Sequence, residues 1–284
     1  EMAFSSIRWE KNGCNLFFYF KLKNMKIKLQ NIFELGYQLA LRDFSSLYRL
    51  SFLGIFWGVA GPLVTSLSFI LLQRSNIINI PELSISYPAY VISGTLIWQL
   101  FVDSLNAPLN QVQINKSVLT KIQFPWLALI VSGFINIMIN FSLKFIPIIL
   151  VLMIFENSFS FQGFFVIIPI LGISFFGFLI GIYVLPIITL FEDLKRVINL
   201  VTGPLVFLTP ALYPVPDSGI LNLFIKNNPL TPFFLTARSF LFNLNDINSI
   251  ESFLIIMIII LFLFIPGCFF YNLSMPILIE RMEN

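Results

Sequence analysis

The sequence predicts an all-α membrane protein with six transmembrane helices, and three observations lead to this prediction. The 284 residues are 57% hydrophobic and 11% charged, with a mean hydropathy of +0.89, whereas soluble domains carry about 25% charged residues. Six stretches of 20 to 35 uncharged residues occur, and a helix needs about 20 apolar residues to cross a bilayer. The stretches are continuously apolar rather than alternating, which favours helices over barrel strands.

The composition also excludes several kinds of site. The chain has no histidine, so it can form no Ser-His-Asp triad, Cys-His pair or His-ligated metal site. Its two cysteines, Cys14 and Cys268, give neither a disulfide framework nor a CxxC spacing. No Gly-Lys-Ser or Gly-Lys-Thr triplet occurs, so the chain lacks a phosphate-binding loop. We expect no catalytic residue, no metal site and no cofactor bound by this chain.

We expect residues 1–30 to form a leader, in which the stretch before Met25 need not be native. Its short apolar patch at 17–20 lacks the small-residue cleavage site of a signal peptide. Residues 50–275 form the six-span domain, followed by a short tail at 276–284. The six spans are predicted near residues 52–72, 87–105, 127–154, 164–190, 197–213 and 253–272.

Residues 31–49 are predicted to be an amphipathic helix that lies in the membrane interface before the first span. Apolar side chains recur at spacings of three and four residues, as on one face of a helix. A soluble helix that caps the cytoplasmic ends of the spans is the alternative. The candidate interface residues are Phe33, Tyr37, Arg42, Phe44, Tyr48 and Arg49.

The distribution of Lys and Arg predicts the orientation. If the N-terminus is cytoplasmic, the cytoplasmic segments carry thirteen Lys or Arg and the outer segments carry three. This bias places both termini in the cytoplasm and makes the chain a multi-pass protein of the cytoplasmic (inner) membrane. Lys144 lies inside the third span, about 27 Å along its helix, so we expect it to reach water at the outer interface.

Within the first span, Gly54, Gly58 and Gly61 share one helical face that would let another helix approach closely. A generic packing helix is the alternative.

Two further segments have sequences that indicate a specific structure or role. The loop at 106–126 can form a short cytoplasmic helix that ends before Pro125, and this helix is either a plain connector or a handle for a soluble partner. Its exposed apolar residues beside lysines would suit docking. On the outer side, prolines between 204 and 232 divide the chain into pieces too short to span the bilayer.

The motif series Arg42-Asp43, Tyr48-Arg49, Leu53-Gly54 and Pro62-Leu63 resembles the opening of the type 2 ABC exporter permeases that move polysaccharides and polyol phosphates. These are the membrane subunits that export O-antigen, capsule or teichoic acid. Further motifs in the same order are Thr120-Lys121 with Phe124-Pro125, Leu208-Thr209-Pro210 with Tyr213-Pro214, and the stretch from Asn228 to Pro232. The likeness covers about residues 28–275.

The resemblance implies roles for three segments. Residues 31–49 would be the interface helix, 114–122 the coupling helix that docks on the ATPase, and 208–240 short re-entrant helices at the outer mouth. An ordinary outer loop is the alternative for the last segment. The implied coupling residues are Asn115, Lys116, Val118, Leu119, Lys121, Ile122 and Phe124. The implied outer-gate residues are Pro210, Tyr213, Pro214, Asn228, Pro229 and Pro232.

The resemblance also implies the partners. The chain would form a homodimer with two copies of an ABC ATPase subunit, which would bind ATP and magnesium. It would contact membrane lipids and a lipid-linked glycan, and no nucleic acid. Aromatic rings stack on sugars and amides bond to hydroxyls, so candidate path residues are Tyr90, Trp98, Asn136 and Tyr183.

Other functions remain open from the sequence. An exporter of small drugs or lipids within the same type 2 class is the nearest alternative. A membrane-embedded glycosyltransferase would need clustered acidic residues, which are scattered singly here. A secondary transporter usually has internal repeats and ionisable residues at mid-membrane, and we find neither in this sequence.

Overall fold

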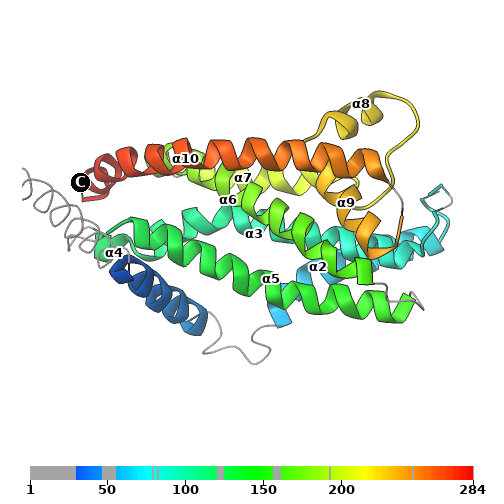
Figure 1. Cartoon of the computed structure of the whole chain (residues 1–284), viewed down its shortest axis with the longest axis horizontal. Coiled ribbons are helices and arrows are strands. Elements are labelled where there is room, and N and C mark those ends of the chain that lie inside the picture. The colour runs from blue at the N-terminus through cyan, green and yellow to red at the C-terminus, as the bar shows by residue number, and fades with distance from the viewer. Residues whose placement is uncertain are drawn as a thin grey trace, which may run out of the picture.

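The structure of the chain is a computed structural model, and it describes residues 30–46, 56–78, 80–81, 83–119, 125–155, 161–191, 193–244 and 246–283. Within these ranges every regular element is helical, as the sequence predicts. The long helices lie roughly side by side along the long axis of the molecule (Figure 1). The predicted leader up to residue 29 and the candidate interface residues Tyr48 and Arg49 lie outside the described ranges.

A helix at 30–46 comes first and is followed by the helices of the bundle. The first half of the bundle contains α2 (Trp57–Arg74), α3 (Tyr87–Ile114), α4 (Lys116–Leu119) and α5 (Leu127–Phe155). The second half contains η2 (Phe161–Val166), α6 (Ile167–Leu190), α7 (Asp193–Leu205), η3 (Val206–Leu208), α8 (Ile220–Asn227), α9 (Thr231–Leu241) and α10 (Ile247–Glu283).

Among the residues that the structure describes, three helical stretches are long and apolar enough to cross a membrane: Leu127–Phe155, Gly163–Leu190 and Ile247–Arg281. They coincide with the third, fourth and sixth predicted spans. The first and second predicted spans fall on α2 and α3. The fifth, at 197–213, is not one long helix, because α7 has only 13 residues and ends at Leu205. At 1.5 Å per residue α7 is about 20 Å long, shorter than the hydrocarbon core of about 30 Å.

Helix α3 lies at the centre of the packing and contacts α2, α5 and α6. Glycines on α6 let this helix approach α3 closely. A Cβ added at Gly177 would lie 2.6 Å from the carbonyl oxygen of Phe101, and one at Gly181 would collide with that of Leu105. Gly177 and Gly181 are four residues apart and so face α3 together, as small residues do between membrane helices.

The helix at 30–46 packs against the start of α5 with one face. Ile32, Leu39 and Asp43 are buried on this face, and Gly36 lies so close to α5 that an added Cβ would be 2.7 Å from Val131. Most of the aromatic face predicted from the sequence points away from the bundle, whereas Phe44 at its end is half-buried and lines a cavity. On this face Phe33, Tyr37 and Leu41 are 60%, 45% and 40% exposed.

The exposed face of α2 is also apolar. Trp57, Val64, Leu67 and Leu71 are each more than half exposed. Among the described residues, nothing lies within 4 Å of a Cβ added at Gly61. The glycine face predicted for close helix packing is therefore not covered by this chain at Gly61.

Candidate functional site

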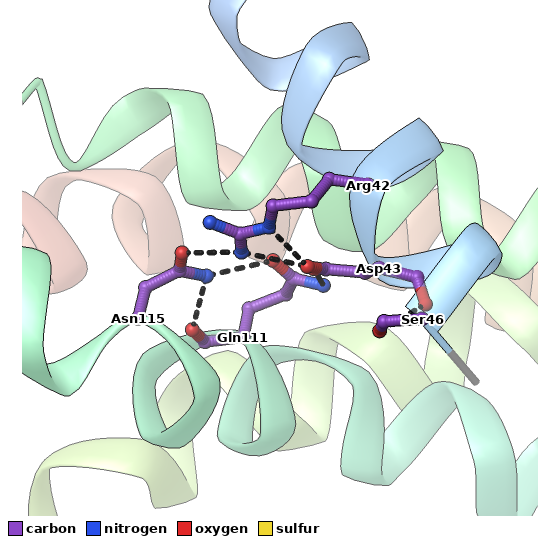
Figure 2. A network of polar contacts seen from close by, with 5 residues as sticks. All are labelled: Arg42, Asp43, Ser46, Gln111 and Asn115. Atoms are coloured by element: carbon purple, nitrogen blue, oxygen red, sulfur yellow. Dashed lines mark hydrogen bonds and ion pairs between the residues drawn. The ribbon is translucent and has the colours of Figure 1, made fainter. Parts of the chain in front are cut away.

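A polar network joins the helix at 30–46 to the end of α3 (Figure 2). Arg42 donates to the Asp43 carboxylate at 2.6 and 3.0 Å and to the side-chain oxygen of Asn115 at 2.7 Å. Gln111 donates to the other oxygen of Asp43 at 3.0 Å. Asp43 and Asn115 are almost fully buried, so the network fixes one segment against the other.

The network brings together two segments that the sequence singled out separately. Arg42 belongs to the predicted interface helix, whereas Asn115 belongs to the predicted coupling segment 73 positions later. Asn115 ends α3, and α4 begins at the next residue. Any displacement of α4 would therefore be transmitted to both α3 and the helix at 30–46.

The predicted coupling segment is exposed at some of the expected positions and buried at others. Lys116 is exposed and Val118 is partly buried, but Leu119 is 3% exposed because it packs in the core with residues of α3 and α5. The expectation that Leu119 is an exposed docking residue is wrong. Lys121, Ile122 and Phe124 lie outside the described residues.

A polar cavity of about 540 Å³ extends from this network into the bundle. Side-chain amides dominate its lining. They come from α3 (Gln99, Asn106, Asn110 and Gln111), from α5 (Asn136 and Asn140) and from α7 (Asn199). Asp43 lines the same cavity, so the network forms part of its wall. Hydroxyl groups of a ligand could both donate to and accept from such amides.

Two polar stripes that face each other form the cavity. On α3, Gln99, Asp103, Asn106 and Asn110 follow one another at spacings of four, three and four residues. On α5, Asn136, Asn140 and Lys144 are each four residues apart. These spacings place each set on one face of its helix. Of these residues, only Asn136 is among the path residues predicted from the sequence, although the spacing of polar residues within apolar helices indicates both stripes.

An ion pair connects the two stripes. Lys144 of α5 donates to one oxygen of Asp103 on α3, while Gln99 donates to the other at 2.8 Å. The Lys144 side chain is 1% exposed and the Asp103 side chain is 27% exposed. The expectation that Lys144 reaches water at the outer interface is wrong, because its ammonium group is turned inward to this carboxylate.

Lys195 lies where α7 borders the same cavity. Its ammonium group donates to the amide oxygens of Asn110, at 3.1 Å, and of Gln113. Partial burial removes water from this ammonium group and lowers the pKa of Lys195 from its ordinary value. No acidic side chain pairs with Lys195 among the described residues.

One predicted outer-gate residue, Pro210, contacts a buried arginine. Arg238 of α9 donates to the carbonyl oxygens of Pro210, Ala211 and Tyr90, and its guanidinium carbon lies 3.4 Å from the centre of the Tyr90 ring. The Tyr90 hydroxyl donates to the carbonyls of Pro210 and Tyr213 at 3.1 and 3.0 Å. Arg238 was not among the sequence candidates.

Two further outer-gate residues donate to carbonyls of η3. Asn228 donates to the carbonyl of Leu208 at 2.8 Å and accepts from the backbone of Leu230. Tyr213 donates to the carbonyl of Phe207. Pro229 precedes α9, Pro232 lies in its first turn, and Pro214 lies in the extended stretch that leads towards α8.

The aromatic path candidates lie away from the cavity. Tyr90 and Trp98 are buried, with the Trp98 ring 5.4 Å from that of Phe101. Tyr183 donates to the carbonyl of Leu263 on α10 at 2.9 Å. Within the described ranges, no three residues of the kinds that bind metals lie close enough together to hold an ion.

Comparisons with known proteins give a consistent result. No model of a protein family matches the chain. Over 201 residues, the chain is 28% identical to the O-antigen export system permease protein RfbA of Myxococcus xanthus, covering 68% of this chain and 74% of the relative. Two RfbA proteins of Klebsiella pneumoniae are 26% and 25% identical over 225 residues, which is 77% of this chain and 84% of each relative. The chain is therefore similar over most of its length to O-antigen export permeases, which confirms the resemblance that its motif series indicated.

Proposed function

We propose that the chain is the permease subunit of an ABC exporter that moves a lipid-linked polysaccharide out across the cytoplasmic membrane. The observation that carries the proposal is the amide-lined cavity between apolar helices. The amides on its wall offer both donors and acceptors, and a hydroxyl-rich glycan supplies groups that match both. The similarity to O-antigen export permeases supports the same substrate class, which includes O-antigen, capsule and teichoic acid chains.

The energy comes from a separate ATPase subunit, which carries the ATP and magnesium. Two copies of this subunit dock on the segment around α4. Lys116 and Val118 contact the ATPase, together with Lys121, Ile122 and Phe124. When the ATPases close, α4 moves, and the network of Arg42, Asp43 and Asn115 carries the movement to α3 and to the helix at 30–46.

Two copies of the chain form the permease. The exposed apolar stripe on α2, with the open space at Gly61, is the face at which they meet. The glycan path runs along the stripes of α3 and α5 and includes Asn136. Tyr90 and Trp98 are buried in this arrangement of helices, so they and Tyr183 would meet the glycan only after the helices shift. The outer gate comprises the segment from Pro210 to Tyr213 with the chain before α9.

Figure 1 supports the orientation that we propose. The helix at 30–46, α4 and the C-terminal end of α10 lie towards one end of the molecule, and α8 lies at the other (Figure 1). The first end faces the cytoplasm, where the ATPase binds, so both termini are cytoplasmic. Phe33 and Tyr37, together with Phe44, Tyr48 and Arg49, contact the lipid interface.

Deletion of the gene tests the proposed function. We expect the deletion strain to lose its surface polysaccharide and to accumulate the lipid-linked glycan inside the cell. Expression of the intact chain from a plasmid restores the surface glycan. Unchanged surface glycan after deletion would contradict the proposal.

Charge reversal on α4 tests the ATPase contact. We expect Lys116→Glu together with Ser117→Glu to reduce co-purification of the ATPase subunit, because both positions are exposed on α4. The matched control is Lys226→Glu, an exposed lysine on α8 at the other end of the molecule. Equal recovery of the ATPase with all variants would exclude docking at α4.

A further inference from the structure

The ion pair between Asp103 and Lys144 is the most unusual feature of the cavity. The two partners are unequally exposed: the Lys144 side chain is 1% exposed, whereas the Asp103 side chain is 27% exposed and lines the cavity. The charge that a ligand would meet is therefore the carboxylate. Lys144 lies behind it and offsets the cost of keeping a carboxylate away from water.

The carboxylate has capacity to bind further donors. A carboxylate offers about four acceptor sites. Gln99 and Lys144 each occupy one, on different oxygens of Asp103. These contacts fix the carboxylate and leave acceptor sites for donors that enter from the cavity.

A second observation points to a ligand at the same place. Asn106 lies three residues after Asp103 on α3 and lines the cavity. Its amide nitrogen donates to the carbonyl of Val102 at 3.0 Å, but its amide oxygen is buried without a hydrogen-bond partner. A buried acceptor without a partner is costly, so a donor from the ligand would stabilise it.

The pair is not needed to explain the stability of the fold. Replacing a buried ion pair by apolar residues of similar size is often neutral or stabilising. Helices α3 and α5 also contact each other elsewhere along their length. A role in binding accounts for the partial exposure of Asp103 towards the cavity. An ion pair with a purely structural role would not need this exposure and could be fully buried.

We propose that Asp103, held by Lys144 and Gln99, is the specificity-determining residue of the cavity and accepts hydrogen bonds from adjacent hydroxyl groups of an uncharged sugar unit. The amides of Asn106 and Asn140 complete the contacts with the same unit. A sugar carboxylate placed against Asp103 is repelled by it, because Lys144 lies behind Asp103, and Lys195, which also lines the cavity, lies on α7 and bonds to Asn110 and Gln113. This inference rests on the proposed function, and it adds both the recognising residue and the preference for uncharged units.

Binding to the purified complex of the chain with its ATPase tests the inference. The probes are maltoheptaose, which is uncharged, and a heptamer of galacturonic acid, which is acidic. We expect the wild-type complex to bind maltoheptaose at least tenfold more tightly than the acidic probe. Tighter binding of the acidic probe would overturn the inference.

Two variants separate recognition from structure. Asp103→Asn keeps the shape of the side chain and removes its charge, and we expect it to weaken maltoheptaose binding about tenfold and to reduce the discrimination against the acidic probe. Asp103→Leu with Lys144→Met removes the whole pair; we expect the same loss of binding, with an unchanged or higher midpoint of thermal unfolding. The matched control, Asp193→Asn with Arg196→Gln, removes an exposed pair and leaves binding unchanged.

The outcomes distinguish this inference from the proposed function. If the deletion strain regains its surface glycan with the Asp103→Leu/Lys144→Met variant as well as with the wild-type chain, and both bind maltoheptaose equally, the inference is wrong and the proposed function stands. If the wild-type chain itself does not restore the surface glycan, the proposed function is wrong and the inference falls with it.

Discussion

Arg238 of α9 links two segments of the chain that are far apart in sequence. It is 2% exposed, and its guanidinium group donates to three carbonyls from two segments that are far apart in sequence. Two of these carbonyls belong to Pro210 and Ala211, just after η3. Because prolines and turns keep this stretch out of a helix, its carbonyls lack helical partners. The planar fork of arginine satisfies several of them at once.

Replacement of Arg238 should therefore destabilise the protein. We expect Arg238→Met to lower the free energy of unfolding by about 3 kcal/mol, because its three hydrogen bonds contribute about 1.5–3 kcal/mol each and the removal of a buried charge offsets part of their loss. Thermal unfolding of the purified protein measures the change. Arg74→Met is the matched control, since Arg74 is exposed at the end of α2. Equal unfolding midpoints for the two variants would show that the carbonyls find other partners.

Asp43 has a comparable place at the end of the molecule that carries α4 (Figure 1). Its carboxylate accepts from Arg42 and from Gln111, so Asp43→Ala leaves both donors without their acceptor. We expect a loss of about 2 kcal/mol in local stability, which makes amide hydrogen exchange in residues 30–46 roughly thirtyfold faster. The control is Glu34→Ala, which removes an exposed carboxylate from the same helix. Equal exchange in both variants would refute the fixing role of the network.

Helix α6 shows how contacts between helices can depend on glycines, which have no side chain. Gly177 and Gly181 let the backbone of α6 approach the carbonyls of α3. The polar stripe of α3 then points away from this contact, towards α5 and the cavity. Packing with α6 on one side thus orients the amide-lined face on the other.

An added methyl group should have opposite effects on stability at Gly181 of α6 and at Gly203 of α7. Gly181→Ala places a Cβ against the Leu105 carbonyl and 3.0 Å from Pro108, so we expect a loss of about 1–3 kcal/mol in stability. Gly203 of α7 has nothing within 4 Å, and Gly203→Ala should stabilise the helix by up to about 1 kcal/mol. Unfolding in denaturant compares the two. Similar effects of both substitutions would contradict the close packing of α6 on α3.

The whole molecule has a distinct polarity along its long axis. The helix at 30–46, α4 and the C-terminal end of α10 lie towards one end, and α8 lies at the other (Figure 1). The excess of Lys and Arg in the segments near the first end agrees with a cytoplasmic location. The polar cavity lies between α3, α5 and α7, next to the network of Arg42 and Asp43.

Labelling in intact cells tests this polarity. Starting from a chain with Cys14 and Cys268 replaced by serine, single cysteines are introduced at Ser117, Lys226 and Arg281. We expect a membrane-impermeant maleimide to label position 226 from outside and the other two only after permeabilisation, because α8 lies at the end of the molecule that we propose to face outward (Figure 1). Labelling of positions 117 and 226 from the same side would contradict the proposed orientation.

Much of the architecture could be predicted from the sequence. The apolar stretches at 127–154, 164–190 and 253–272 correspond to the three helices with membrane-spanning length and composition. Prolines correctly indicated the irregular chain near Pro210. The stretch at 197–213 is apolar enough for a span, but the structure divides it into α7, which ends at Leu205, and η3, which ends at Leu208.

The candidate site was harder to predict, as Lys144 and Leu119 show. Helical spacing indicates which residues share a face, but it does not indicate what that face meets. Lys144 was expected to reach water and instead binds Asp103, 41 positions earlier in the chain. Leu119 was expected to be exposed beside lysines and instead packs in the core.

The sequence by itself therefore determined that this chain forms helices in a membrane and which family of permeases it resembles, because composition, apolar length and local motifs are properties of contiguous residues. Only the tertiary structure decided which polar groups meet: Arg42 with Asn115, Lys144 with Asp103, and Arg238 with the carbonyls after η3. Those meetings depend on the rotation and approach of separate helices. Glycines on α6 and the close packing of α3 set the rotation and approach of the helices, and no local sequence pattern encodes either of these.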